Sequence, residues 1–268
     1  MTRDTCSPEK STTNTGVRVL AGQHVLVTGG SEGIGYGIAE RLLDAGATVS
    51  LAARRPGVLD AAVERLRMQC GDSNRVSGVV ADISDADSIT AMFETAEGRN
   101  GPLNVLVANA GSGSVVPFLE LTAQQWRDCI ELNLTGTFLC VQAAARSMVE
   151  RTDENRSIIV VSSIRALGAR PSLVPYGTSK AGLNQLVRLT AYELAATGVR
   201  VNALSPGITA TPLAQDRNNL FDERAATVPM GRAGTPADMA AAALYLASPD
   251  SAFVTGTNLV VDGGESLY

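Results

Sequence analysis

The chain has 268 residues, of which 45% are hydrophobic and 18% are charged, so it can form a large buried core and is not disordered as a whole. Its 22 basic and 27 acidic side chains give a net charge of −5, which lacks the basic surplus needed for phosphate contacts and argues against nucleic-acid binding. No apolar stretch approaches the roughly 20 residues of a membrane span.

Histidines and cysteines are too few or too scattered for several kinds of site. The chain has one histidine, His24, which argues against a Ser-His-Asp hydrolase and against sites with two histidine ligands. The four cysteines form no CxxC pair, so we predict reduced thiols and no metal site. The polar segment Met1–Gly16 lacks the apolar core of a secretory signal, and we predict a flexible tail on a cytoplasmic protein.

Short apolar runs alternate along the chain with stretches in which apolar residues recur every three or four positions. The runs, each of which predicts a strand, are His24–Thr28, Thr48–Ala52, Val76–Ala81, Asn104–Ala108, Ser157–Val161, Arg200–Leu204 and Asn258–Val261. Strands that alternate with helices indicate right-handed crossovers and a parallel sheet covered on both faces. We therefore predict an α/β fold from residue 17 to residue 268: a single-domain, Rossmann-type, doubly wound parallel sheet of about seven strands.

The segment from Pro212 to Thr235 breaks this rhythm with polar residues, prolines and glycines. We predict a loop and a helix here that pass over the C-terminal edge of the sheet, where ligands bind in such folds.

A glycine-rich turn, Thr28–Gly35, joins the first predicted strand to the first predicted helix. A side chain there would block the approach of a pyrophosphate to the backbone and to the helix N-terminus. The glycines are spaced more widely than in the usual dinucleotide fingerprint, and such a turn can also be merely flexible, but its position favours dinucleotide binding. The cofactor contacts predicted in this turn are Gly29, Ser31, Glu32, Gly33, Ile34 and Gly35.

The end of the second predicted strand bears on the choice of dinucleotide. An NAD enzyme places a carboxylate there for the ribose 2′-hydroxyl, whereas this chain has Ala53 followed by Arg54 and Arg55. A guanidinium suits a 2′-phosphate, so we predict that NADP(H) is favoured over NAD(H). Two alternatives stay open: the arginines could simply be solvated, and Glu32 could repel a 2′-phosphate.

Ser163, Tyr176 and Lys180 form the sharpest pattern in the chain. Tyr176 and Lys180 are four residues apart and share a helix face, so the ammonium favours the phenolate and lowers the pKa of the phenol. Such a tyrosine can give a proton to a carbonyl oxygen, and the serine, at the end of a predicted strand, can orient that oxygen. A tyrosine–lysine pair alone is often a chance surface pair, but the upstream serine makes chance a poor explanation.

Together these motifs resemble the classical short-chain dehydrogenase/reductase family over nearly all of residues 17–268. The matching positions are Thr28, Gly29, Gly33, Gly35, Asp82, Asn109, Ala110, Gly111, Asn133, Ser163, Tyr176, Lys180, Pro206, Gly207, Thr211, Asp262, Gly263 and Gly264. Ala108 replaces the first asparagine of the family's NNAG motif, which is not the catalytic one, so we expect little effect.

The resemblance implies a catalytic tetrad. Tyr176 would be the general acid in reduction and the base in oxidation, while Lys180 would bind the nicotinamide ribose and lower the pKa of the tyrosine. Ser163 would hold the substrate oxygen. Asn133 would kink its helix and hold a water that links Lys180 to solvent.

The resemblance also implies cofactor contacts and an assembly. The further positions that would contact the cofactor are Asp82, Ile83, Asn109, Ala110, Gly111, Pro206, Gly207, Ile208 and Thr211. The Ile208 backbone would meet the carboxamide, and Thr211 would hydrogen-bond the carboxamide or a phosphate. The family's usual form implies a homotetramer, made by the helices around residues 133–149 and 176–196 and by the last helix and strand.

These observations predict an NADP(H)-dependent oxidoreductase that interconverts a small ketone and a secondary alcohol. A second hypothesis is a 3-oxoacyl-carrier-protein reductase, although the positions that dock the acidic carrier are Glu154 and Thr197 here rather than basic residues. A non-catalytic NADP-binding regulator is disfavoured by the intact tetrad. The expected partner is a small-molecule substrate, with no nucleic acid and no membrane, and both a steroid and a sugar stay open.

Three further residues carry expectations that are mainly structural. We expect His24 at the surface or at a strand entry, and Trp126 in the core. Arg165, two residues after Ser163, could offer a cation to an acidic substrate, but we favour a solvated loop arginine.

Overall fold

The computed structural model describes residues 18–152, 155–211 and 220–267. Within these residues the chain forms one parallel sheet of seven strands, in the order β3-β2-β1-β4-β5-β6-β7. The strands are β1 (His24–Thr28), β2 (Thr48–Ala53), β3 (Val76–Val80), β4 (Val105–Ala108), β5 (Ser157–Val161), β6 (Arg200–Pro206) and β7 (Asn258–Val261). The predicted doubly wound parallel sheet is confirmed, and the predicted strand bounds differ from these by at most two residues.

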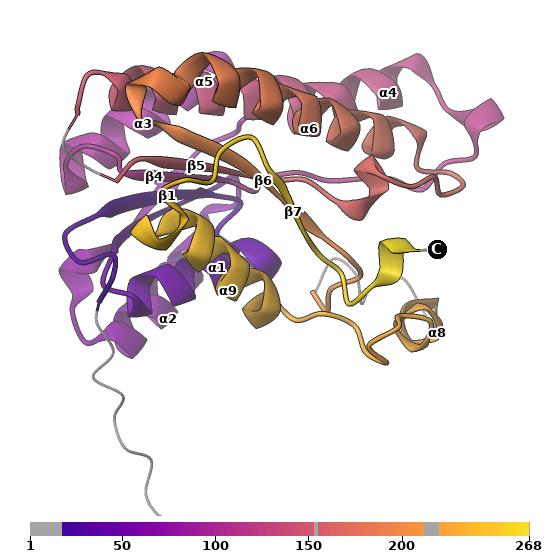
Figure 1. The fold of residues 1–268 in the computed structure, drawn as a ribbon, viewed down its shortest axis with the longest axis horizontal. Coiled ribbons are helices and arrows are strands. Elements are labelled where there is room, and N and C mark those ends of the chain that lie inside the picture. Colours follow the sequence, from indigo (N-terminus) through magenta and orange to yellow (C-terminus); the bar gives the residue numbers. More distant parts are fainter. Residues whose placement is uncertain (1–17, 153–154, 212–219, 268) are drawn as a thin grey trace, which may run out of the picture.

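Helices cover both faces of the sheet (Figure 1). One layer holds α1 (Gly33–Asp44), α2 (Pro56–Cys70) and α9 (Pro236–Ala247). The other holds α3 (Ala86–Asn100), α4 (Ala123–Ile130), α5 (Gly136–Val149) and α6 (Val174–Leu194). The short helix α8 (Leu220–Ala226) lies near the C-terminal residues, and it confirms the helix that was predicted between residues 212 and 235.

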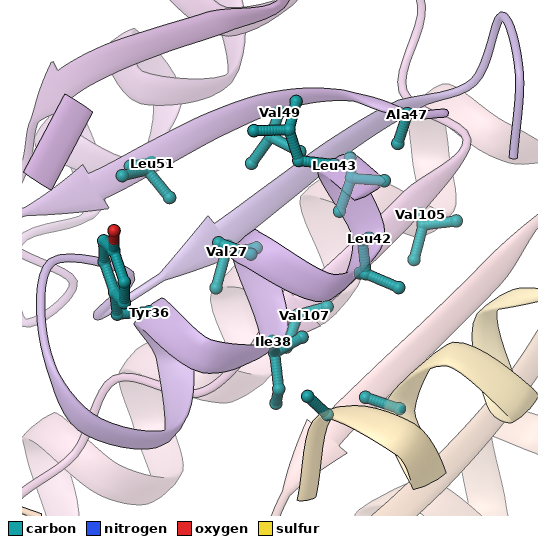
Figure 2. Close-up of a cluster of buried hydrophobic side chains, with 14 of the residues drawn as sticks. Val27, Tyr36, Ile38, Leu42, Leu43, Ala47, Val49, Leu51, Val105 and Val107 are labelled. Carbon is teal, nitrogen blue, oxygen red and sulfur yellow. The ribbon is translucent and has the colours of Figure 1, made fainter. Parts of the chain in front are cut away.

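Two apolar clusters, one on each face, hold these layers to the sheet. Val25 and Val27 of β1 belong to one cluster with Ile38 and Leu42 of α1. Figure 2 shows Val27, Ile38 and Leu42 in this cluster. Leu26, between the two valines, belongs to the cluster on the opposite face. Each such side chain contributes roughly 1.5–3 kcal/mol when it is fully buried. Burial on both faces explains why the strands are continuous apolar runs in the sequence.

His24 is buried at the first position of β1, so of the two expected places the strand entry is the one observed. Its side chain is 2% exposed and lies 2.8 Å from both Gly101 O and Ser50 Oγ. Since a carbonyl can only accept, Nδ1 carries the proton and Nε2 accepts from the serine hydroxyl. Burial lowers the pKa of this imidazole.

The expectation that Trp126 is a core residue is wrong. Trp126 is 36% exposed on α4, and the buried residue of that helix is Cys129. The apolar spacing that suggested burial is also the spacing of a helix face that packs against another molecule.

Some of the expectations above concern residues that the structure does not describe. The predicted tail Met1–Gly16, the residues 212–219 and Glu154 lie outside the described residues. Among those described, no helix combines the length and apolar character that crossing a membrane requires. The same residues contain no cluster of three or more His, Cys, Asp or Glu side chains that could hold a metal ion.

Candidate active site

A cavity of about 660 Å³ opens where β1, β2, β4, β5 and β6 end. The carboxyl ends of parallel strands share one edge of the sheet, so the loops that follow them converge there. Most of the predicted site residues line this cavity. Those that do not are Gly35, Asp82 and Asn133.

Tyr176 and Lys180 lie one turn apart in the first half of α6, and both line the cavity. The Lys180 ammonium lies 5.7 Å from the centroid of the Tyr176 ring and donates to Val161 O at 2.8 Å. Burial deprives this ammonium of water and lowers the pKa of Lys180 to about 8. A cation beside the phenol favours the phenolate, which is what a tyrosine that gives up a proton requires.

Two neighbouring serines at the end of β5 have different surroundings. Ser163 lines the cavity, and its Oγ accepts from the Arg165 backbone N–H at 3.1 Å. Ser162 Oγ donates to Lys180 O at 3.1 Å, which fixes β5 against α6. Both serines line the cavity, but the Ser162 hydroxyl donates its proton within the chain, whereas the Ser163 hydroxyl keeps its proton for a ligand.

Asn133 lies behind the cavity wall, in a π-helical turn (Glu131–Thr135) between α4 and α5. Its side chain is fully buried, donates to Ser112 O at 2.7 Å and accepts from Ser112 N at 2.9 Å. These two bonds fix the loop that follows β4. A π turn is a common place for a helix to kink, and both the expected kink and the expected water stay predictions.

The turn before α1 forms a cradle that side chains would fill. Gly29 and Gly33 have φ values of +63° and +56°, which favour glycine. A Cβ on Gly35 would lie 2.3 Å from Gly29 O, and Asn109 Nδ2 donates to Gly29 O at 3.1 Å. The Glu32 side chain makes no cap hydrogen bond at the start of α1. This backbone therefore fits the pyrophosphate of a dinucleotide, which would meet the helix N-terminus directly.

At the other side of this turn, two arginines pair with two carboxylates. Arg54 Nη1 is 3.7 Å from Asp82 Oδ2, and Arg55 forms an ion pair with Glu32. Both arginines are largely exposed and line the cavity. Asp82 and Glu32 thus compete with any phosphate for these two guanidinium groups.

Glu265, in the turn after β7, is a residue that the sequence reasoning missed. Its Oε2 accepts from the Ile208 backbone N–H at 2.7 Å, and its Oε1 pairs with Arg165 and, at 3.3 Å, with Arg224. The Ile208 N–H, expected to meet a carboxamide, thus has a partner within the chain. The expectation that Arg165 is a solvated loop residue is wrong, because its side chain is only 19% exposed and is paired.

Two residues that were not among the predicted catalytic and cofactor contacts also line the cavity. Arg170 lies in the loop before α6, and a Cβ on Gly113 would lie 2.8 Å from Cδ2 of Tyr176. The loops on either side are joined where Val116 N–H donates to Ser172 O at 2.9 Å.

Comparisons with known proteins agree with this arrangement. Residues 29–266 match the family model described as enoyl-(acyl carrier protein) reductase. The chain is 35% identical over 246 residues to a 3alpha-hydroxysteroid dehydrogenase of Mediterraneibacter gnavus. The aligned region covers 91% of this chain and 97% of the relative. It is 36% identical to 3beta-hydroxysteroid dehydrogenase 1 of Eggerthella lenta, over 93% of this chain and 95% of the relative. The crystal structure of a short-chain type dehydrogenase/reductase from Mycobacterium marinum superposes with a TM-score of 0.87 at 32% identity, over 94% of this chain and 98% of that one.

Proposed function

Because the chain belongs to the short-chain dehydrogenase/reductase family, we propose that it is an NADP(H)-dependent enzyme that interconverts a small ketone and the corresponding secondary alcohol. The observation that carries the proposal is the convergence of Ser163, Tyr176 and Lys180 on one wall of the cavity. We further propose that residues 17–268 form the catalytic domain. The general class, an oxidoreductase with a nicotinamide cofactor and a small-molecule substrate, follows from the family itself.

The residues of this chain would divide the work as follows. Tyr176 gives its phenolic proton to the carbonyl oxygen in reduction and takes it back in oxidation. Lys180 holds the positive charge that favours the phenolate, and Ser163 Oγ donates a hydrogen bond to the same oxygen. The nicotinamide ring, when bound, supplies or accepts the hydride. Asn133 positions the wall through its bonds to Ser112.

The cofactor would extend from this catalytic end to the turn before α1. The residues that would hold it are Gly29, Ser31, Glu32, Gly33, Ile34, Gly35, Arg54, Arg55, Asp82, Ile83, Asn109, Ala110, Gly111, Tyr176, Lys180, Pro206, Gly207, Ile208 and Thr211. Support for NADP(H) comes from Ala53, where an NAD enzyme would have a carboxylate, and from the two arginines that follow it. Their pairing with Asp82 and Glu32 leads us to expect a graded preference rather than an exclusive one.

The test is turnover of a ketone panel by the wild type and by Tyr176→Phe, with NADPH and NADH and in both directions. Loss of the proton donor should lower kcat by about 10²-fold or more. Cofactor binding, followed by fluorescence, should persist because the fold and the glycine cradle do not depend on the hydroxyl. Tyr192→Phe, on the exposed side of the same helix, is the matched control and should keep full activity. Full turnover by a folded Tyr176→Phe variant would reject the mechanism.

The same panel separates the alternatives. Strong selectivity for carrier-bound 3-oxoacyl substrates would favour a 3-oxoacyl-carrier-protein reductase, the class nearest to the description of the matching family model. Cofactor binding without any turnover would favour a regulator.

A further inference from the structure

Glu265 begins the last described turn of the chain, yet its carboxylate contacts three residues of the cavity wall. Its Oε2 accepts from the Ile208 backbone N–H at 2.7 Å, and its Oε1 pairs with Arg165 and Arg224. These partners belong to three segments: the loop after β6, the turn after β5, and α8. The carboxylate is only 14% exposed, and it joins three parts of the catalytic end of the cavity.

The backbone of the last turn directs the Glu265 side chain to this place. Asp262, just after β7, accepts from the Gly264 N–H at 2.9 Å and from the Ser266 N–H at 2.8 Å, so its two oxygens stabilise the turn. The turn also packs closely on the loop after β6. A Cβ on Gly207 would lie 2.6 Å from Cβ of Asp262 and 3.0 Å from Oε2 of Glu265. The carboxylate can therefore approach the backbone of that loop because Gly207 has no side chain.

The pair with Arg165 connects Glu265 to the serine of the proposed site. The Arg165 backbone N–H donates to Ser163 Oγ at 3.1 Å, and the Ala166 N–H donates to Ser163 O at 2.9 Å. The serine and the arginine thus belong to one compact turn, residues 163–168. A partly buried guanidinium that is bonded to a carboxylate is held more firmly than a solvated one. Restraint of the Arg165 side chain therefore also restrains the turn in which the Ser163 hydroxyl lies.

We propose that Glu265 is a positioning residue, which holds the turn 163–168 and the loop after β6 in place around the catalytic end of the cavity. The inference rests on the proposed function, which assigns the substrate oxygen to the Ser163 hydroxyl. Glu265 itself lies outside the cavity lining, so it acts through Arg165 and Ile208 and takes no part in the transfer of hydride or proton. Small displacements of an orienting group can cost up to about 10²-fold in rate.

The first experiment measures amide hydrogen exchange in the protein without cofactor. Glu265→Ala should accelerate exchange by about tenfold at residues 163–168 and at Ile208, because these segments lose a charge-assisted hydrogen bond. Glu265→Gln keeps an oxygen for the Ile208 N–H, and should therefore protect Ile208 better than the alanine does. Exchange in β1 should be unchanged. Unchanged exchange at both segments, or equal acceleration in β1, would overturn the proposal, since Glu265 would then hold nothing locally.

The second experiment is a double-mutant cycle between Glu265→Gln and Ser163→Ala, measured with the best ketone of the panel. Glu265→Gln alone should lower kcat/KM by about tenfold or more, mainly through kcat. In the Ser163→Ala background the same change should have a much smaller effect, because the hydroxyl that it helps to place is absent. Equal effects in the two backgrounds would overturn a positioning role through the serine.

Glu94→Gln is the matched control for both experiments. Glu94 is exposed on α3 and lies outside the cavity lining, so the same loss of charge should change neither exchange at residues 163–168 nor kcat/KM.

The two experiments separate this inference from the proposed function, because hydrogen exchange needs no turnover. Local acceleration of exchange by Glu265→Ala, in a protein whose wild type turns over no ketone, would contradict the proposed function but support the contacts of Glu265. Ketone turnover that Glu265→Gln leaves unchanged would do the reverse.

Discussion

Arg54 lies where the choice between two cofactors would be decided. Its guanidinium is 61% exposed and only loosely paired with Asp82, so turning towards a 2′-phosphate costs little. Charge-assisted hydrogen bonds to that phosphate would contribute about 1.5–3 kcal/mol each. We therefore expect the wild type to favour NADPH by at least about tenfold in kcat/KM.

Arg54→Asp should bring NADH close to parity, because the new carboxylate repels the phosphate and can accept from a free 2′-hydroxyl. Arg41→Asp, the same change of charge away from the cavity, should leave the ratio as it is. Steady-state kinetics with both cofactors measure the ratio. Equal use of the two cofactors by the wild type, or an unaltered ratio in the Arg54 variant, would show that this arginine does not read the phosphate.

His24 couples the stability of the fold to pH. Burial lowers its pKa below the usual 6.5, whereas the unfolded chain takes up the proton near that value. Between the two pKa values the unfolded state binds more protons, so the free energy of unfolding falls as the pH falls below about 6.5 and is unaffected by this group at higher pH. Urea unfolding from neutral pH down to about pH 5.5 should show this fall, and His24→Gln should reduce it. An equally steep fall in the variant would assign the effect to other groups.

Some residues of the site could be predicted from the sequence and others could not. Tyr176 and Lys180 were predictable because four residues of separation fix a shared helix face. Glu265 was not, because its partners Arg165 and Ile208 lie 100 and 57 positions away and nothing in the local pattern joins them. Its role follows only from the packing of the last turn against the loops after β5 and β6.

The π-helical turn Glu131–Thr135 is the element on which the position of Asn133 depends. Gly136 directly follows this turn, and a Cβ on Gly136 would lie 2.1 Å from the carbonyl oxygen of Ile83. Since that oxygen is backbone, it cannot move aside as the end of a side chain could. The close approach of this helix to the loop after β3 is therefore available only to glycine.

Gly136→Ala should lower the free energy of unfolding by about 1–3 kcal/mol or more through overpacking, and should also reduce activity by shifting Asn133. Gly98→Ala in α3 is the matched control, because nothing lies within 4 Å of its Cβ position. There the same change should stabilise the protein by about 0.5–1 kcal/mol. Chemical unfolding of both variants checks the pair, and a neutral Gly136→Ala would refute the packing argument.

At the level of elements, the strands were predictable because burial on both faces leaves continuous apolar runs. The π turn was not visible in the apolar pattern, because a turn of five residues is too short to establish a period of its own. Only the family resemblance implied a kink at Asn133. Helix α4 shows the same limit, because its apolar spacing does not tell a core-facing tryptophan from an outward-facing one.

At the scale of the whole molecule, four large apolar side chains are exposed on one helical layer. Trp126 on α4, Phe138 on α5, and Leu189 and Tyr192 on α6 all belong to the layer shown above the sheet in Figure 1. The most exposed of them, Tyr192, has 87% of its surface accessible. Large exposed apolar side chains that gather on one layer often mark an interface.

We therefore expect a homotetramer in which this layer packs against another copy of the chain. Leu189→Glu with Tyr192→Glu places two charges on the outer side of α6 and should shift light scattering towards smaller species, because an interface that buries unpaired carboxylates is destabilised. Met68→Glu, a comparably exposed apolar position on α2 in the opposite layer, is the control and should leave the assembly intact. A wild type that is monomeric at micromolar concentration would contradict the tetramer. A double variant that keeps the wild-type mass would show that α6 is not part of its interface.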